Sequence, residues 1–298
     1  MTKIIKVPAS TANLGCGFDS LGMALKLYLT VEIVEPSDAW IIEHDFGPQI
    51  PIDKNNLIIQ TALKIEPTLP PHHLKMRSEI PLEHGLGSSS SAIVAGIKIA
   101  EVIGNRGMSI LEQLEWACQI EGHPDNVVPT LLGGLQVASY DADLSRLNEE
   151  NLTFLSLPVP TCSMIAFVPN YSLSTKAARN VLPASFARQK AVMASSKANV
   201  LVAALTQRKL IPAGKMMESD LFHEGYRSTL IPELAKIRAI AHQHQAYATY
   251  LSGAGSTIMT WLPKEHLAEF KADLKDFSNT HQGEILELKV DTKGARVK

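Results

Sequence analysis

The run Gly85-Leu86-Gly87-Ser88-Ser89-Ser90-Ser91 decides the fold class, because it stands directly before an apolar helical segment at residues 92–103. Glycines let the backbone turn sharply, the first amides of a helix lack internal partners, and the helix dipole places partial positive charge there. The sequence therefore predicts an anion-binding loop, suited to a phosphate, at the start of a buried helix. A plain glycine-serine turn that caps a helix is the alternative for the loop judged alone.

Two familiar loop families do not match this run. No Gly-Lys-Ser/Thr follows the glycines, as a Walker A loop requires, and the third glycine of the dinucleotide fingerprint is missing. A serine hydrolase elbow needs glycine two residues after its serine, where this run has another serine. A hydrolase using a loop serine with His123 and Asp125 is a competing hypothesis, although residues two apart do not easily form a base and its orienter. A non-catalytic nucleotide-binding sensor is a third.

Length, net charge and cysteine content limit the number of domains, the classes of binding partner and the compartment to be expected. The 298 residues exceed the usual size of one domain, so two lobes are expected. A net charge of -2 offers no basic field for nucleic acid or an anionic membrane, and both partners are excluded on that ground. Three cysteines without a Cys-x-x-Cys pair, and an N-terminus without the apolar core of a signal peptide, indicate a reducing cytoplasm.

Hydrophobic periodicity and cap signals predict alternating helices and strands. Strands are expected at residues 3–7, 25–34, 74–80, 164–168, 248–251 and 256–262. Helices are expected at residues 57–65, 92–103 and 110–120, the last capped by Ser109, and within 183–208 and 232–245. A glycine-rich loop is expected at residues 8–22, and Gly133-Gly134 opens a further strand. Pro158 and Pro160 place the boundary between an N-terminal domain, residues 1–157, and a C-terminal domain, residues 158–298.

Three motifs in order resemble the GHMP kinase superfamily: Pro8-Ala9-Ser10-Thr11-Ala12-Asn13-Leu14-Gly15-Cys16-Gly17-Phe18-Asp19, the loop at residues 81–91, and Leu251-Ser252-Gly253-Ala254-Gly255-Ser256. The Thr-Ala-Asn-Leu-Gly-x-Gly-Phe-Asp form, with His123-Pro124-Asp125-Asn126-Val127, is similar to the homoserine kinase family in particular. Mevalonate kinases instead carry a lysine and a Gly-Glu-His run in the first motif.

The resemblance implies a two-lobed α+β fold, with an N-terminal ribosomal-protein-S5-like domain, a C-terminal ferredoxin-like domain and the active site between them. It implies an ATP-dependent kinase that phosphorylates the hydroxyl of L-homoserine to O-phospho-L-homoserine, in threonine biosynthesis, with Mg²⁺. Another GHMP kinase acting on a different acceptor, such as mevalonate, is the alternative. Dimers are common in the family, so a homodimer is expected.

The resemblance also assigns roles residue by residue. The nucleotide and its phosphates would contact Asn56, Pro81, Gly85, Leu86, Gly87, Ser88, Ser89 and Ser90. Homoserine would contact Asn13, Asp19, His123, Asp125, Arg179, Arg227 and Gly253, with the two arginines on its carboxylate. The catalytic residues would be Asn126, Thr175 and Arg179. Mg²⁺ would bind Ser89 and, by spacing to His123, Glu115, with Glu121 as the rival.

Overall fold

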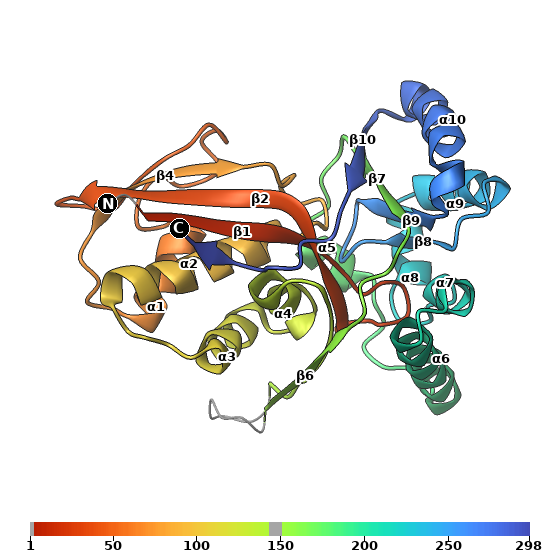
Figure 1. The fold of residues 1–298 in the computed structure, drawn as a ribbon, viewed down its shortest axis with the longest axis horizontal. Coiled ribbons are helices and arrows are strands. Elements are labelled where there is room, and N and C mark those ends of the chain that lie inside the picture. Colours follow the sequence, from red (N-terminus) through yellow and green to blue (C-terminus); the bar gives the residue numbers. More distant parts are fainter. Residues whose placement is uncertain (1–2, 143–150) are drawn as a thin grey trace.

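The computed structural model describes residues 3–142 and 151–298, whose strands form two sheets lying side by side (Figure 1). The first sheet has the order β11-β1-β2-β4-β3, with β5 pairing β2 and β6. Its strands are β1 (Lys3–Ala12), β2 (Leu21–Pro36), β3 (Ile41–Glu43), β4 (His72–Ser78), β5 (Leu135–Tyr140), β6 (Leu152–Leu157) and β11 (Arg296–Val297). Helices α1 (Leu57–Ile65), α2 (Ser88–Gly104), α3 (Ile110–Glu121) and α4 (Pro124–Leu132) lie along one side of it (Figure 1).

The hairpin of β1 and β2 is longer than predicted. Residues 8–12 continue β1 instead of starting the expected loop, and the register shifts at Pro8/Ala9. Proline has no N–H for a ladder, and an irregular register is where a sheet accommodates it. The glycine-rich loop is therefore confined to residues 13–20 at the tip of the hairpin, where it turns toward the second lobe.

The helix predictions hold closely in this half. Helix α1 has the predicted bounds, and Ser109 caps α3 by accepting a hydrogen bond from the Glu112 amide at 3.1 Å. Helix α2 begins at Ser88, four residues earlier than predicted, with Gly87 as its N-cap at φ 72°. The serines of the loop therefore form the first turn of the helix, with their amides at its free end.

The second sheet has the antiparallel order β10-β7-β9-β8. Its strands are β7 (Ser163–Pro169), β8 (Ala248–Leu251), β9 (Ile258–Leu262) and β10 (Gly283–Leu288). The helices that follow β7 are α5 (Thr175–Asn180), α6 (Arg188–Thr206), α7 (Leu210–Met217), α8 (Glu224–Arg227) and α9 (Glu233–Gln243), and α10 (Leu267–His281) precedes β10. This βαββαβ order is the ferredoxin-like topology, so the α+β class is confirmed.

The two halves share a core. Along β7, Ile165 and Phe167 pack against the cluster under α9 and α10, whereas Met164 and Ala166 join the core that extends through the first lobe. The chain also ends in the first lobe, where Val297 of β11 pairs with Ile5 of β1. The predicted boundary coincides with the end of β6, but the last residues lie with the N-terminal sheet. Within the described ranges, no helix is both long and apolar enough to cross a bilayer.

Candidate active site

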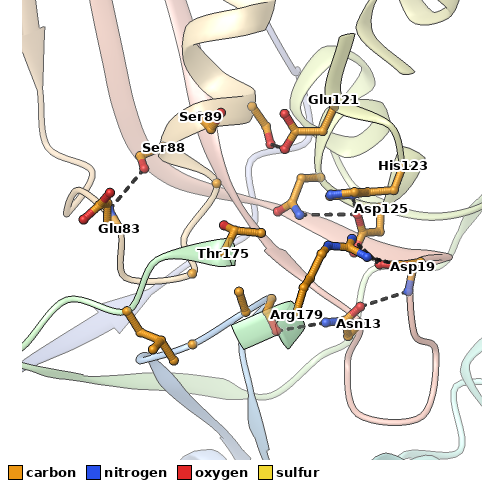
Figure 2. A pocket seen from close by; sticks show the side chains of 18 of the residues that line it. Asn13, Asp19, Glu83, Ser88, Ser89, Glu121, His123, Asp125, Thr175 and Arg179 are labelled. Carbon is orange, nitrogen blue, oxygen red and sulfur yellow. Dashed lines mark hydrogen bonds and ion pairs between the residues drawn. The ribbon is translucent and has the colours of Figure 1, made fainter. Parts of the chain in front are cut away.

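A cleft opens where the serine loop, the hairpin tip, the third glycine motif and helix α5 meet (Figure 2). Its volume is about 600 Å³, and most of the predicted site residues line it. These are Asn13, Asp19, Gly85, Gly87, Ser88, Ser89, Ser90, His123, Asp125, Asn126, Thr175, Arg179, Arg227 and Gly253. The structure therefore brings together residues that lie up to 240 positions apart, as in the contact of the Asn13 side chain with the Gly253 carbonyl.

The backbone of the loop is held from two directions. Gly85 and Gly87 have φ values of 77° and 72°, in the left-handed region that favours glycine. Ser252 Oγ donates a hydrogen bond to the Gly85 carbonyl at 2.6 Å, and the Ser10 amide donates to the Leu86 carbonyl at 3.1 Å. The first and third motifs thus fix the loop that both flank.

Two predicted contacts of this loop lie outside the cleft. The side chain of Leu86 is fully buried in the core of the first lobe, so only its backbone serves the loop. Pro81 does not line the cleft either. The resemblance placed these residues by sequence position, whereas in the structure the Leu86 side chain packs into the core and Pro81 lies outside the lining.

The glutamate beside the loop is Glu121. It is the last residue of α3, lines the cleft, and accepts a hydrogen bond from Ser90 Oγ at 2.6 Å. Burial raises the pKa of its carboxyl group. Glu115 does not line the cleft, because six residues along a helix bring it to a different face. Glu115, the ligand inferred from spacing, therefore lies outside the cleft, whereas its rival Glu121 lies inside it; the choice of metal ligand stays a prediction.

Asn56 belongs to a neighbouring hollow of about 1490 Å³ that shares Ser88 and Ser89 with the cleft. Its side chain caps α1, accepting from the Ile58 amide at 3.0 Å and donating to the Pro51 carbonyl at 2.8 Å. Apolar side chains make much of the lining: Leu29, Phe46, Ile50, Leu57, Met76 and Leu82. A flat apolar group attached to a phosphate chain would fit this pair of connected spaces.

At the opposite end of the cleft, Arg179 of α5 faces Asp19 of the hairpin tip (Figure 2). The guanidinium grips both carboxylate oxygens, at 3.1 and 3.4 Å, and both side chains remain partly exposed. The Asp19 amide donates to Asn13 Oδ1 at 3.0 Å, and Asn13 Nδ2 donates to the Gly253 carbonyl at 3.0 Å. Thr175, one turn earlier on α5, lines the same cleft.

Arg227 of α8 is only 2% exposed yet reaches the cleft. Its Nε donates to the Ala178 carbonyl at 3.1 Å, and its Nη1 donates to the Gly253 carbonyl at 3.0 Å and to His223 Nδ1 at 3.1 Å. Burial, and next the charge of Arg179, lower the pKa of the guanidinium to about 10. Among the described residues, Arg227 forms no ion pair with a carboxylate. It is a buried cation held by neutral acceptors.

A polar chain runs behind the cleft from His123 to Ser10. His123 Nδ1 lies 2.5 Å from Asp125 Oδ1, Asn126 Nδ2 donates to the same oxygen at 3.4 Å, and Ser10 Oγ donates to Asn126 Oδ1 at 2.8 Å. Burial opposes the charge of His123, but the hydrogen bond and charge of Asp125, with further help from neighbouring carboxylates, raise its pKa to about 9. His123 is therefore protonated at neutral pH.

Asp19, His123 and Asp125 present ligand atoms within 4.8 Å of one another, the spacing of a metal cluster. The same three side chains also line the amino-acid end of the cleft, where they place two carboxylates beside the His123 imidazole. Phe18, Glu83, Leu173, Ala254 and Gly255 also line the cleft, although the motifs assigned them no role. All of them except Leu173 lie inside quoted motifs and could have been found there, whereas Leu173 carried no signal.

An anion loop and a buried cation facing one cleft, on this pair of sheets, define a small-molecule kinase of the GHMP class. The family model described as GHMP kinases N terminal domain matches residues 56–134, and the one described as GHMP kinases C terminal matches residues 201–279. The homoserine kinase of Streptococcus gordonii is 48% identical over 99% of both chains, and that of Lactobacillus acidophilus is 51% identical over 91% of this chain and 92% of its own. The solved homoserine kinase of Cytophaga hutchinsonii superposes with a TM-score of 0.83 at 26% identity, over 100% of this chain and 97% of its own. The chain belongs to the homoserine kinase family of the GHMP kinases.

Proposed function

We propose that this chain transfers the terminal phosphoryl group of ATP to the hydroxyl of L-homoserine, the O-phospho-L-homoserine step of threonine biosynthesis. The observation that carries the proposal is Arg227, a buried cation without a carboxylate partner that opens on the same cleft as the anion loop. A buried charge is costly unless it is paired. Asp19, Asp220 and Asp125 act on the Arg227 guanidinium only from beyond ion-pair distance, so a ligand carboxylate would be its first direct anionic partner.

We infer that Asp19 and Arg179, which pair with each other in this structure, would bind the two charged groups of an amino acid. Homoserine carries an ammonium and a carboxylate, and on binding these would replace each residue's partner, the ammonium at Asp19 and the carboxylate at Arg179 and Arg227. A partly exposed ion pair contributes only about 0–1 kcal/mol, so its separation costs little. Mevalonate has no ammonium and would leave Asp19 unpaired.

The loop would hold the phosphates through the free amides of residues 88–90, with the nucleoside in the adjacent hollow beside Asn56. The Ser90 hydroxyl and the Glu121 carboxylate contact each other, and Ser89 lines the same cleft. All three side chains offer hard oxygen donors, which suits Mg²⁺. When bound there, the ion would neutralise charge on the phosphate oxygens.

The protein's own part in the reaction is positioning and charge stabilisation. Asn126 and Thr175 line the cleft between the loop and the amino-acid end, where they would orient the hydroxyl for in-line attack. His123 is protonated and Asn126 cannot accept a proton at neutral pH, so neither serves as a general base. The hydroxyl proton would pass late, to a phosphate oxygen.

The test is ATP consumption by the purified protein with Mg²⁺, comparing L-homoserine with mevalonate, galactose, L-serine and no acceptor, with the product mass checked. Turnover that depends on homoserine and adds one phosphoryl group is the expected result. If another acceptor is preferred, the assignment as a kinase stands but the assignment of homoserine as its substrate is refuted. If ATP binds but is not turned over with any acceptor, the result favours a non-catalytic nucleotide-binding sensor. A homodimer and a cytoplasmic location stay predictions from the sequence.

A further inference from the structure

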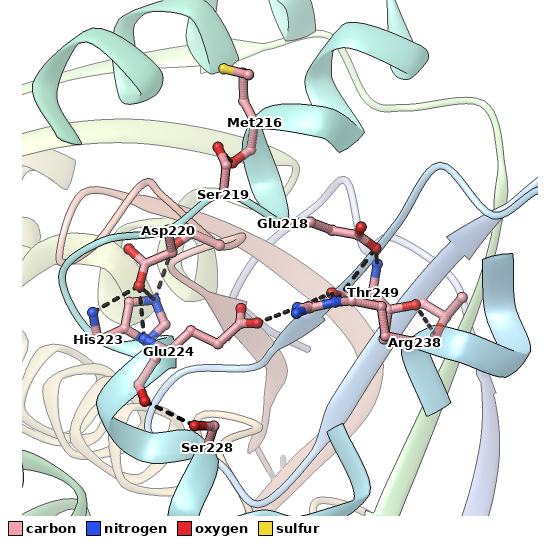
Figure 3. A network of polar contacts seen from close by, with 12 residues as sticks. Met216, Glu218, Ser219, Asp220, His223, Glu224, Ser228, Arg238 and Thr249 are labelled. Carbon is pink, nitrogen blue, oxygen red and sulfur yellow. Dashed lines mark hydrogen bonds and ion pairs between the residues drawn. The ribbon is translucent and has the colours of Figure 1, made fainter. Parts of the chain in front are cut away.

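His223 is a buried histidine that belongs to none of the three motifs and does not line the cleft. It stands directly before α8, the short helix that carries Arg227 (Figure 3). Its Nε2 lies 2.9 Å from the Gly15 carbonyl oxygen, and its Nδ1 lies 3.1 Å from Arg227 Nη1. One ring therefore touches both the glycine loop of the hairpin tip and the buried arginine.

The two contacts determine the state of the ring. A carbonyl oxygen only accepts hydrogen bonds and a guanidinium only donates them. His223 must therefore carry its proton on Nε2 and present a lone pair at Nδ1, which is the neutral form. An imidazolium would have no acceptor for Arg227 and would place a second cation against it.

The surroundings hold the ring in this orientation. Asp220 accepts hydrogen bonds from the amides of Phe222, His223 and Glu224 at 3.1, 2.8 and 2.7 Å, which fixes the backbone before α8 (Figure 3). The ring of Phe18 stacks on the imidazole, with centroids 5.0 Å apart and planes at 20°. The imidazole is thus clamped between the hairpin tip and the α8 turn.

The charged groups around His223 come from both sides. Asp220 Oδ2 lies 3.9 Å from its Nε2, Arg227 faces its Nδ1, and Asp19 approaches from the hairpin tip. Burial lowers the pKa of the ring, the charge of Arg227 lowers it further, and the two aspartates act in the opposite sense without reversing the direction. The neutral form agrees with the hydrogen-bond pattern.

We propose that His223 is a positioning residue, whose neutral imidazole joins the loop carrying Asp19 to the guanidinium of Arg227. The partners of the ligand's ammonium and carboxylate are thereby held at a fixed separation. This inference rests on the proposed function, because the distance matters only for a ligand that bears both charges.

Two substitutions separate the two contacts. The amide of His223→Gln extends to the position of Nε2, where it can donate to Gly15 but offers Arg227 no acceptor at Nδ1. His223→Asn places its oxygen near Nδ1 and retains that acceptor while releasing Gly15. We expect the homoserine KM to rise about tenfold in His223→Gln and about threefold in His223→Asn, with the ATP KM within about twofold of the parent.

The matched control is His72→Gln on β4 of the first lobe, which should change neither KM. A homoserine KM equal to the parent's in both His223 variants would overturn the inference. Equal rises of the homoserine KM and the ATP KM in these variants would overturn it as well. If the parent itself shows no homoserine-dependent turnover, the proposed function fails instead.

A second measurement does not depend on the variants folding. Nitrogen-15 NMR of histidine-labelled parent protein, with and without homoserine, should show one non-titrating ring protonated at Nε2 between about pH 5 and 8. Its assignment to His223 comes from its contacts to the Phe18 ring, which stacks on it. An Nδ1–H tautomer or an imidazolium at this position would refute the proposal.

Discussion

The two ends of the cleft are built from different materials. The phosphate end is backbone: glycines with positive φ, the free amides of α2, and carbonyls tied to the first and third motifs. The amino-acid end is side chains, with Asp19 and Arg179 paired and Arg227 buried among neutral acceptors. The first end should fail when a single Cβ is added, whereas the second should fail when charge is removed.

The largest effect is expected for Gly85→Ala. The new Cβ would collide with the Ser252 carbonyl oxygen and lie 2.8 Å from that of Gly255, at a φ that side chains rarely adopt. Displacing the loop removes several amide contacts to phosphate, so kcat/KM for ATP should fall about 1000-fold. This fall is measured by steady-state kinetics with ATP as the varied substrate.

Gly107→Ala is the matched control for that loop substitution. It has a similar φ of +61°, but nothing lies within 4 Å of the added Cβ. We expect parent turnover and a stability loss of about 1 kcal/mol. Retention of more than about a tenth of parent activity by Gly85→Ala would show that the phosphate end is not a rigid backbone cradle.

The second-largest effect is expected for Arg227→Met, at the amino-acid end of the cleft. Removing the cation should raise the homoserine KM about 100-fold and leave the ATP KM unchanged, because charge-assisted hydrogen bonds to a carboxylate are lost. A parallel rise in both KM values would contradict the division between the two ends.

Glu121 is the side chain that sharpens the comparison, because it stands at the phosphate end. Glu121→Gln should raise the Mg²⁺ concentration for half-maximal activity about tenfold, as one anionic oxygen ligand is lost. Glu115→Gln, on the same helix α3 but outside the cleft, is the control and should leave it nearly unchanged. If Glu115→Gln raised this Mg²⁺ concentration more than Glu121→Gln, Glu115 would be the metal ligand, as inferred from spacing.

The smallest effect concerns the charge of His123. Its pKa rises from the ordinary 6.5 to about 9 in the folded chain, so its stabilisation is complete below pH 6.5 and lost as pH rises through 9. That contribution is at most about 3 kcal/mol. Melting temperature should fall by a few degrees over this range in the parent and by less in His123→Asn. Equal slopes would show that His123 is not charged in the native state.

The sequence by itself determined the elements that depend on near neighbours. The bounds of α1, the Ser109 cap of α3 and the anion loop before α2 follow from periodicity, cap chemistry and glycine dihedrals, all of which act within a few residues. The family motifs added which residues share the cleft.

Only the tertiary structure decided the pairings between distant segments. It brought Glu121 and not Glu115 to Ser90, because the end of α3 and not residue spacing sets which carboxylate meets that hydroxyl. It paired Arg179 with Asp19, 160 positions away, and joined His223 to Gly15 across 208 positions. Such contacts arise when two lobes pack on a common core, and no local pattern in the chain encodes which side chains the packing brings face to face.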